Sequence, residues 1–144
     1  MASSIHTKEV QVTTETLWSF LKQKENWAVL IPGYLHHEFE SNGDMIWVFK
    51  GDFGIVQKAV KLKLHVIEET ENSKLAFDLE GLSDNINGSG YFEIKDESLL
   101  EGSLTMKAGG FLAGMINPVL EKFVPETIET LTNAIATNVA KETV

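Results

Sequence analysis

The sequence predicts an α+β fold in which a curved, antiparallel, seven-stranded sheet wraps around one long C-terminal α-helix. Three observations predict it. In the last third of the chain, apolar residues recur at steps of three and four, the spacing of an amphipathic helix. Before that, most stretches alternate apolar and polar residues, as in strands with one dry face. Short turn sequences separate those stretches, which favours antiparallel hairpins.

The N-terminal part supplies one strand and two short helices. Residues 5–12 predict the first strand, with Ile5, Val10 and Val12 as its apolar positions. Thr13 is a suitable helix N-cap, and Glu15 places an acid in the first turn of a helix that ends near residue 21. A second short helical piece spans residues 26–31 and is stopped by Pro32-Gly33. Six more strands follow: one from Tyr34 onward, then 44–50, 60–66, 75–80, 86–95 and 100–108.

Composition and charge narrow the possible functions. The 144 residues fit a single domain, 1–144, and the absence of cysteine excludes disulfides and thiolate chemistry. The net charge is −9 and every basic residue is lysine, which argues against nucleic acid as a partner. The N-terminus resembles no secretory signal, and no apolar run approaches the roughly 18 residues of a membrane span. We therefore expect a cytoplasmic protein.

The C-terminal segment, residues 109–141, can be one amphipathic helix or two in series. Leu112, Met115, Ile116, Val119 and Phe123 share one side, whereas the apolar residues from Val124 to Ile135 lie about a quarter turn away. Pro118 and Pro125 favour a bend near the switch, and Asn117 could instead cap a second helix. We expect residues 109–124 to act as a bent gate and the rest to pack as core.

Three glycines, Gly88, Gly90 and Gly102, share the parity of the apolar residues in their strands. Glycine inside a strand marks a bend or a close approach, and on a concave face it can also leave empty volume. Sheet curvature and a true cavity remain equal alternatives.

Short motifs resemble a known superfamily. The pattern Trp27…Ile31-Pro32-Gly33, Gly88-Ser89-Gly90 and residues 109–113 resembles the helix-grip (SRPBCC) superfamily of START and Bet v 1-like proteins. Within it, the sequence is most similar to the CoxG family, which is associated with carbon monoxide dehydrogenase. The resemblance implies a deep apolar cavity for lipids, quinones, sterols or polyketides, and service to a redox enzyme at the inner membrane face. Because the sequence stops at Val144, just past the helix, we expect membrane contact to be at most transient.

The leading hypothesis is a carrier of a hydrophobic small molecule, with no cofactor, no metal and no catalytic residue. His36 and His37 point to opposite faces of a strand, so they do not form a metal site together. Large aromatic residues beside methionine suit an apolar guest, although most could simply be core. The expected cavity residues are Trp27, His37, Trp47, Phe49, Leu62, Phe77, Gly90, Phe92, Met106, Met115, Val119 and Phe123.

Two other functions remain open. A polyketide cyclase or hydrolase would need an inward polar group, and His37, Lys58 and Tyr91 are the candidates. A ligand-free adaptor would recruit a redox enzyme with its cavity filled by side chains. The sequence does not decide the oligomeric state.

Overall fold

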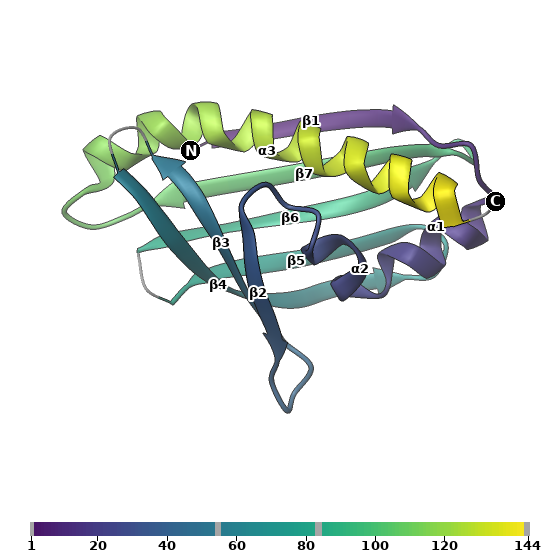
Figure 1. Ribbon diagram of the computed structural model, residues 1–144, viewed down its shortest axis with the longest axis horizontal. Helices are drawn as coiled ribbons and strands as arrows, with labels where there is room; N and C mark the ends of the chain where they lie inside the picture. The colour runs from purple at the N-terminus through teal and green to yellow at the C-terminus, as the bar shows by residue number, and fades with distance from the viewer. Residues whose placement is uncertain (1, 54–55, 83–84, 143–144) are drawn as a thin grey trace.

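The computed structural model describes residues 2–53, 56–82 and 85–142, with only the backbone of 52, 53, 56–58 and 142 (Figure 1). Its elements follow the predicted order. They are β1 (Ala2–Glu9), α1 (Thr14–Leu21), α2 (Lys24–Ala28), β2 (Tyr34–Phe39), β3 (Met45–Phe53), β4 (Val56–Thr70), β5 (Lys74–Gly81), β6 (Ile86–Lys95), β7 (Leu99–Ala108) and α3 (Ala113–Glu142).

The strands form one seven-stranded sheet in the order β1-β7-β6-β5-β4-β3-β2, and every neighbouring pair is antiparallel. Helix α3 runs along β1 and β7 on the inner face of this sheet. Helix α1 lies near the C-terminal end of α3, with α2 beside it (Figure 1). The predicted fold class is therefore confirmed. One long helix can cover this sheet because alternation along each strand gives it a single apolar face.

The two short helices are joined to the sheet by their own polar groups. Thr13 caps α1 as predicted, since its hydroxyl accepts a hydrogen bond of 3.1 Å from the Thr16 N–H. The indole of Trp27, on α2, donates to the carbonyl of Leu21 at 2.9 Å. The indole of Trp47, on β3, donates to the carbonyl of Ala28 at the same distance. These bonds satisfy both buried indoles and fix α1 and α2 over the sheet.

Helix α3 is one continuous helix with Pro118 and Pro125 inside it. Asn117 does not cap a second helix. Its side chain instead forms two hydrogen bonds with Ala108, accepting from the backbone N–H at 2.8 Å and donating to the carbonyl at 3.0 Å. The start of α3 is thereby tied to the end of β7. Within the described residues, none of the helices combines the length and the apolar character required to span a bilayer.

The C-terminal part of α3 packs as core, as predicted. Val124, Ile128, Leu131 and Ile135 are each at most 3% exposed. Between them lies Thr132, which is fully buried. This part of the helix therefore holds the sheet in the manner of an ordinary hydrophobic core.

The glycines of the sheet do not leave an empty space beneath α3. A Cβ atom at Gly102 would collide with the hydroxyl of Thr132, so the absent side chain lets the helix approach β7 closely. A Cβ at Gly90 would lie 2.9 Å from the ring of Phe77, which already occupies that volume. At Gly90 and Gly102 the missing side chain therefore marks a close approach of neighbouring atoms and not empty volume.

Tyr91 lies on the outer face of the sheet, so its prediction as an inward-facing group is wrong. It pairs with Ser103, while its neighbour Phe92 pairs with Gly102 on the inner side. Its hydroxyl donates to a carboxylate oxygen of Glu101 at 2.7 Å, and the ammonium of Lys74 sits 4.5 Å from the ring centroid. Partial burial and the Glu101 carboxylate raise the pKa of Tyr91 to about 12. The same hydrogen bond, with Lys95 at 3.2 Å, lowers the pKa of Glu101.

We expect Gly102→Ala to destabilise the protein by about 1–3 kcal/mol, because the new methyl group overpacks the interface with Thr132. Gly114→Ala is the matched control. No atom lies within 4 Å of its added Cβ, and it sits inside a helix, so it should stabilise by about 0.5–1 kcal/mol. Urea unfolding of both variants measures the difference, and equal effects would show that α3 does not press on Gly102.

The raised pKa of Tyr91 predicts a specific alkaline behaviour. Its contribution to stability is present below the usual tyrosine pKa of 10.0 and is lost as the pH rises through about 12. In a Tyr34→Phe background, Tyr91 is the one tyrosine left, and its tyrosinate absorbance should titrate at about 12. Adding Glu101→Gln should move the titration toward 10.0, and an unchanged titration would disprove the role of Glu101.

Candidate ligand-binding site

Aromatic side chains fill most of the interior between the sheet and its helices. The fully buried Trp27 lies with its ring centroid 5.6 Å from those of Trp47 and Phe77 and 5.1 Å from that of Phe92. Its neighbours meet it edge-on or stacked, the arrangements that aromatic pairs prefer. Trp27 therefore contributes to the floor of the interior rather than to an open surface.

A void of about 20 Å³ remains where this aromatic layer meets α3. Such a volume is about that of one water molecule. Among the described residues that surround this void, side chains occupy the space in which the resemblance places a deep cavity. The void is lined by Ile31, Trp47, Phe49, Leu62, Phe77, Leu79, Phe92, Ser103, Leu104, Met106, Phe123, Thr127, Ile128 and Leu131.

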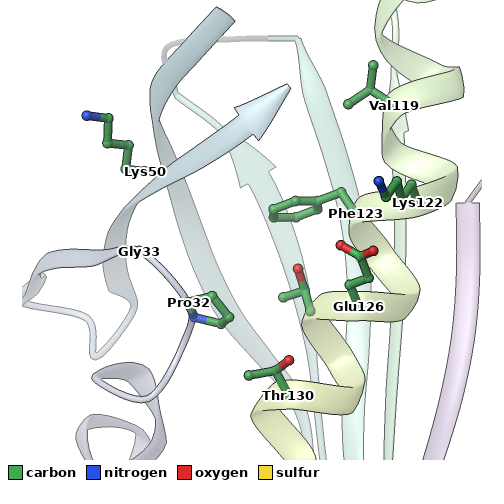
Figure 2. A pocket seen from close by; sticks show the side chains of 9 residues that line it. Pro32, Gly33, Lys50, Val119, Lys122, Phe123, Glu126 and Thr130 are labelled. Atoms are coloured by element: carbon green, nitrogen blue, oxygen red, sulfur yellow. The ribbon is translucent and has the colours of Figure 1, made fainter. Parts of the chain in front are cut away.

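A larger groove of about 530 Å³ opens on the surface beside this void (Figure 2). One wall is α3, with Val119, Phe123 and Thr130, and the other is the Pro32–Gly33 turn together with the backbone near Lys50. In this view Phe123 extends from α3 toward the strands, whereas the ammonium of Lys50 points away from the groove. The volume lies within the range of about 300–1,000 Å³ that ligand pockets occupy.

The second wall is fixed by the glycine that follows Pro32. Gly33 has a φ of +78°, and a Cβ there would collide with the carbonyl of Lys50. Its carbonyl accepts a hydrogen bond of 2.8 Å from the Lys50 N–H. Only glycine allows the turn to lie this close to β3 in this conformation. The Pro32-Gly33 motif therefore positions one side of the groove.

Phe123 and Thr127 line both the groove and the void. Phe123 is half-buried, and its ring lies parallel to that of Phe49, with centroids 6.2 Å apart and an interplanar angle of 9°. Thr127, one helical turn further on, is 4% exposed. The ring of Phe123 thus forms part of the partition between the outer and the inner space.

The rim of the groove on α3 is polar and mixed in charge. Glu126 lies one helical turn after Lys122, and Thr130 lies one turn after Glu126 on the same rim. Below them the surface is apolar, with Phe123, Val119 and Pro32. Such an arrangement suits a molecule with an apolar body and a polar end.

The structure brings together many of the predicted cavity residues but not all. Trp47, Phe49, Leu62, Phe77, Phe92, Met106 and Phe123 surround the void, and Val119 lines the groove. Gly90 lies beneath the ring of Phe77.

Four predicted residues line neither space. Trp27 and Gly90 are buried, and the other two lie away from both the groove and the void. Met115 is 71% exposed on the first turns of α3 and lines neither the groove nor the void. His37 is half-buried on the edge strand β2, where its Nδ1 is 2.7 Å from the hydroxyl of Tyr34. It pairs with Trp47 across the strands but does not line the void. The side chain of Lys58 lies outside the described residues.

Sequence reasoning missed the polar residues of the groove. Lys122, Glu126, Thr127 and Thr130 recur at the spacing of one helix face, and Phe123 is on the same face. That spacing was the available signal. In the part of the chain that the structure describes, no group of three or more histidine or acidic side chains is placed to hold a metal ion.

Comparisons with known proteins agree with this architecture. One family model matches residues 1–143, which is nearly the whole chain. A search of the curated proteins gave no match. Among solved structures, a conserved protein from Geobacillus kaustophilus has a TM-score of 0.76 at 20% identity, covering 97% of this chain and 96% of its own.

Two further structures are similar. A protein from Thermus thermophilus has a TM-score of 0.76 at 15% identity and covers 99% of both chains. The Zhui aromatase/cyclase from Streptomyces sp. R1128 has a TM-score of 0.66 at 14% identity, covering 99% of this chain and 95% of its own. At these identities the likeness shows the fold. The chain thus belongs to the family whose model spans residues 1–143, and its fold is the helix-grip, SRPBCC-like fold of these neighbours.

Proposed function

We propose that this protein binds and carries a small hydrophobic molecule, lipid-like or quinone-like, between its sheet and α3. The observation that carries the proposal is the shared wall: Phe123 and Thr127 line both the surface groove and the inner void. A guest enters through the groove and takes the place of the Phe123 ring. The space for its apolar part is created by side-chain movement.

The energy of this movement is modest. A stacked aromatic pair such as Phe123 and Phe49 contributes about 0.5–1.5 kcal/mol beyond its buried area. The ring is only half-buried, so turning it into the groove loses only part of its contacts. An apolar guest that fills the vacated position restores the buried surface, at about 25 cal/mol per Å². Met106, on the void wall, is a flexible side chain that adapts to different shapes.

The polar groups favour binding over catalysis. The hydroxyl of Thr127 can hold one polar atom of the guest at the junction, and Lys122 and Glu126 can solvate a polar end at the rim. Two of the solved neighbours, the Zhui aromatase/cyclase and the di-domain ARO/CYC StfQ, are named as enzymes. In this chain, however, Tyr91 is on the outer face and His37 is on an edge strand, away from the void. A carrier therefore agrees better with the lining than a cyclase does.

The resemblance to the CoxG family supports a narrower form of the proposal, in which the carrier serves a membrane-linked redox enzyme. A ligand-free adaptor would use the same partner without exchange of a guest. The presence or absence of a bound guest distinguishes the carrier from the adaptor. Native mass spectrometry after mild extraction from cells should detect the protein with a bound apolar molecule, and a protein that is always empty would contradict the carrier.

We expect Phe123→Ala to increase the affinity for the neutral apolar probe N-phenylnaphthylamine, because it removes part of the partition between groove and void. Fluorescence titration measures the affinity. Phe39→Ala is the matched control, since Phe39 is 47% exposed on β2 and lines neither space.

A second variant tests the route. Val119→Trp adds bulk to the wall of the groove and should slow probe uptake in stopped-flow measurements, while Phe39→Ala should not. If Phe123→Ala and Val119→Trp both bind the probe as the wild type does, the groove is not the entrance.

A further inference from the structure

The beginning of α3 carries a compact exposed apolar surface, which we call the apolar tip and define as Phe111, Leu112 and Met115. The side chain of Phe111 is fully exposed, Leu112 is 51% exposed and Met115 is 71% exposed. Figure 1 shows the turn between β7 and α3 at one extreme end of the molecule. The tip therefore projects from the body of the protein instead of forming part of its core.

Polar groups around the apolar tip form hydrogen bonds within the protein. The side chain of Asn117 uses both its donor and its acceptor on the backbone of Ala108. Several backbone N–H groups are also bonded within the turn, which lowers the cost of moving it out of water. These bonds are Gly109 N–H to Asn85 O at 2.7 Å, Ala113 N–H to Gly110 O at 3.3 Å, and the N–H groups of Met115 and Ile116 to Leu112 O at 3.0 Å each.

The segment that carries the tip contains no charge. Residues 108–120 include no lysine or acidic residue, although the chain has 12 lysines and 21 acids and a net charge of −9. An uncharged surface can enter an apolar phase without desolvating an ion. The chemistry of this end is complementary to hydrocarbon.

We propose that the apolar tip is a membrane-docking element that inserts into the interfacial region of a bilayer made of zwitterionic lipid. A protein partner is the less favoured occupant. A specific protein interface normally surrounds its apolar centre with charged and polar groups that fix the orientation. Here the nearest charges in the sequence are Lys107 before the tip segment and Glu121 after it, and none lies within the segment itself. A bilayer requires no such register, and exposed aromatic and aliphatic side chains are sufficient for shallow insertion.

Vesicle sedimentation tests the proposal with the full chain and phosphatidylcholine vesicles. The wild type should bind, and Phe111→Ser should weaken the partitioning about tenfold or more, because a large apolar group no longer enters the bilayer. Phe111 is fully exposed, so this variant should keep the melting temperature of the wild type. The matched control, Phe39→Ser, changes another exposed phenylalanine on β2 and should bind vesicles as the wild type does.

A fluorescence measurement locates the inserted residue. The native tryptophans Trp18, Trp27 and Trp47 are all at most 4% exposed, so they respond little to the vesicle surface. The emission of Phe111→Trp should shift to the blue when phosphatidylcholine vesicles are added. Phosphatidylglycerol in the vesicles should reduce binding, because the protein carries a net charge of −9.

Clear results would overturn the docking element. The proposal is wrong if the wild type does not sediment with phosphatidylcholine vesicles, or if Phe111→Ser binds them equally well. A wild-type dimer that Phe111→Ser dissociates would also contradict it, because the tip would then contact a second copy of this chain. Phosphatidylcholine is itself lipid-like, so Val119→Trp, which changes the groove wall and leaves the tip intact, serves as the second control. It should sediment with the vesicles as the wild type does, and this result separates docking from uptake of a guest.

Discussion

The contact between α3 and β7 determines the rest of the architecture. Because Gly102 has no side chain, Thr132 lies against the strand and brings the C-terminal part of the helix close to the sheet. This closeness has a cost, since the hydroxyl of Thr132 is buried and has no hydrogen-bond partner among the described residues. The hydrophobic residues around it, from Val124 to Val139, outweigh that cost.

The N-terminal turns of α3 are more exposed to solvent than its tightly packed C-terminal part. The first fully buried apolar residue of α3 is Leu120, and the turns before it are exposed or half-buried. Asn117 fixes this part through polar bonds to Ala108 instead of through hydrophobic packing. Side chains near this transition, Val119 and Phe123, therefore keep a solvent-facing side and form the groove. The gate expected over residues 109–124 stays a prediction, and its pivot would have to include the Asn117 bonds.

Periodicity in the sequence was sufficient for the fold because each element has a strong pattern. Alternation assigned the inner residues of β4, and steps of three and four assigned the buried stripe of α3. The same alternation could have corrected the prediction for Tyr91. Tyr91 has the parity of Asn87 and Ser89, not that of Phe92, and this parity places it on the outer face. The exposure of Met115 could not be found this way, because the stripe identifies a helix face but not where the sheet beneath it ends.

The size of the interior could not be predicted either, for a different physical reason. Curvature and glycine positions follow from the backbone, but empty volume depends on how the aromatic side chains are oriented. Phe77 fills the space over Gly90, and Trp27 packs against Trp47 and Phe92. The volume of the void, about 20 Å³ here, therefore depends on the rotamers of these side chains.

The groove and the apolar tip are consecutive parts of one helix face. The uncharged segment 108–120 reaches Val119 on the groove wall, and the first charges beyond it, Glu121 and Lys122, come one helical turn after the tie at Asn117. Along α3 the surface therefore changes from apolar at the tip to amphipathic at the groove within a few turns. A hydrophobic molecule moving between a bilayer and the groove along this face would pass no charged side chain of residues 108–120. The order of residues along α3 therefore favours exchange of the guest at the end of the groove near the tip. The other end, at Thr130, has the acidic residues Glu126 and the exposed Glu129.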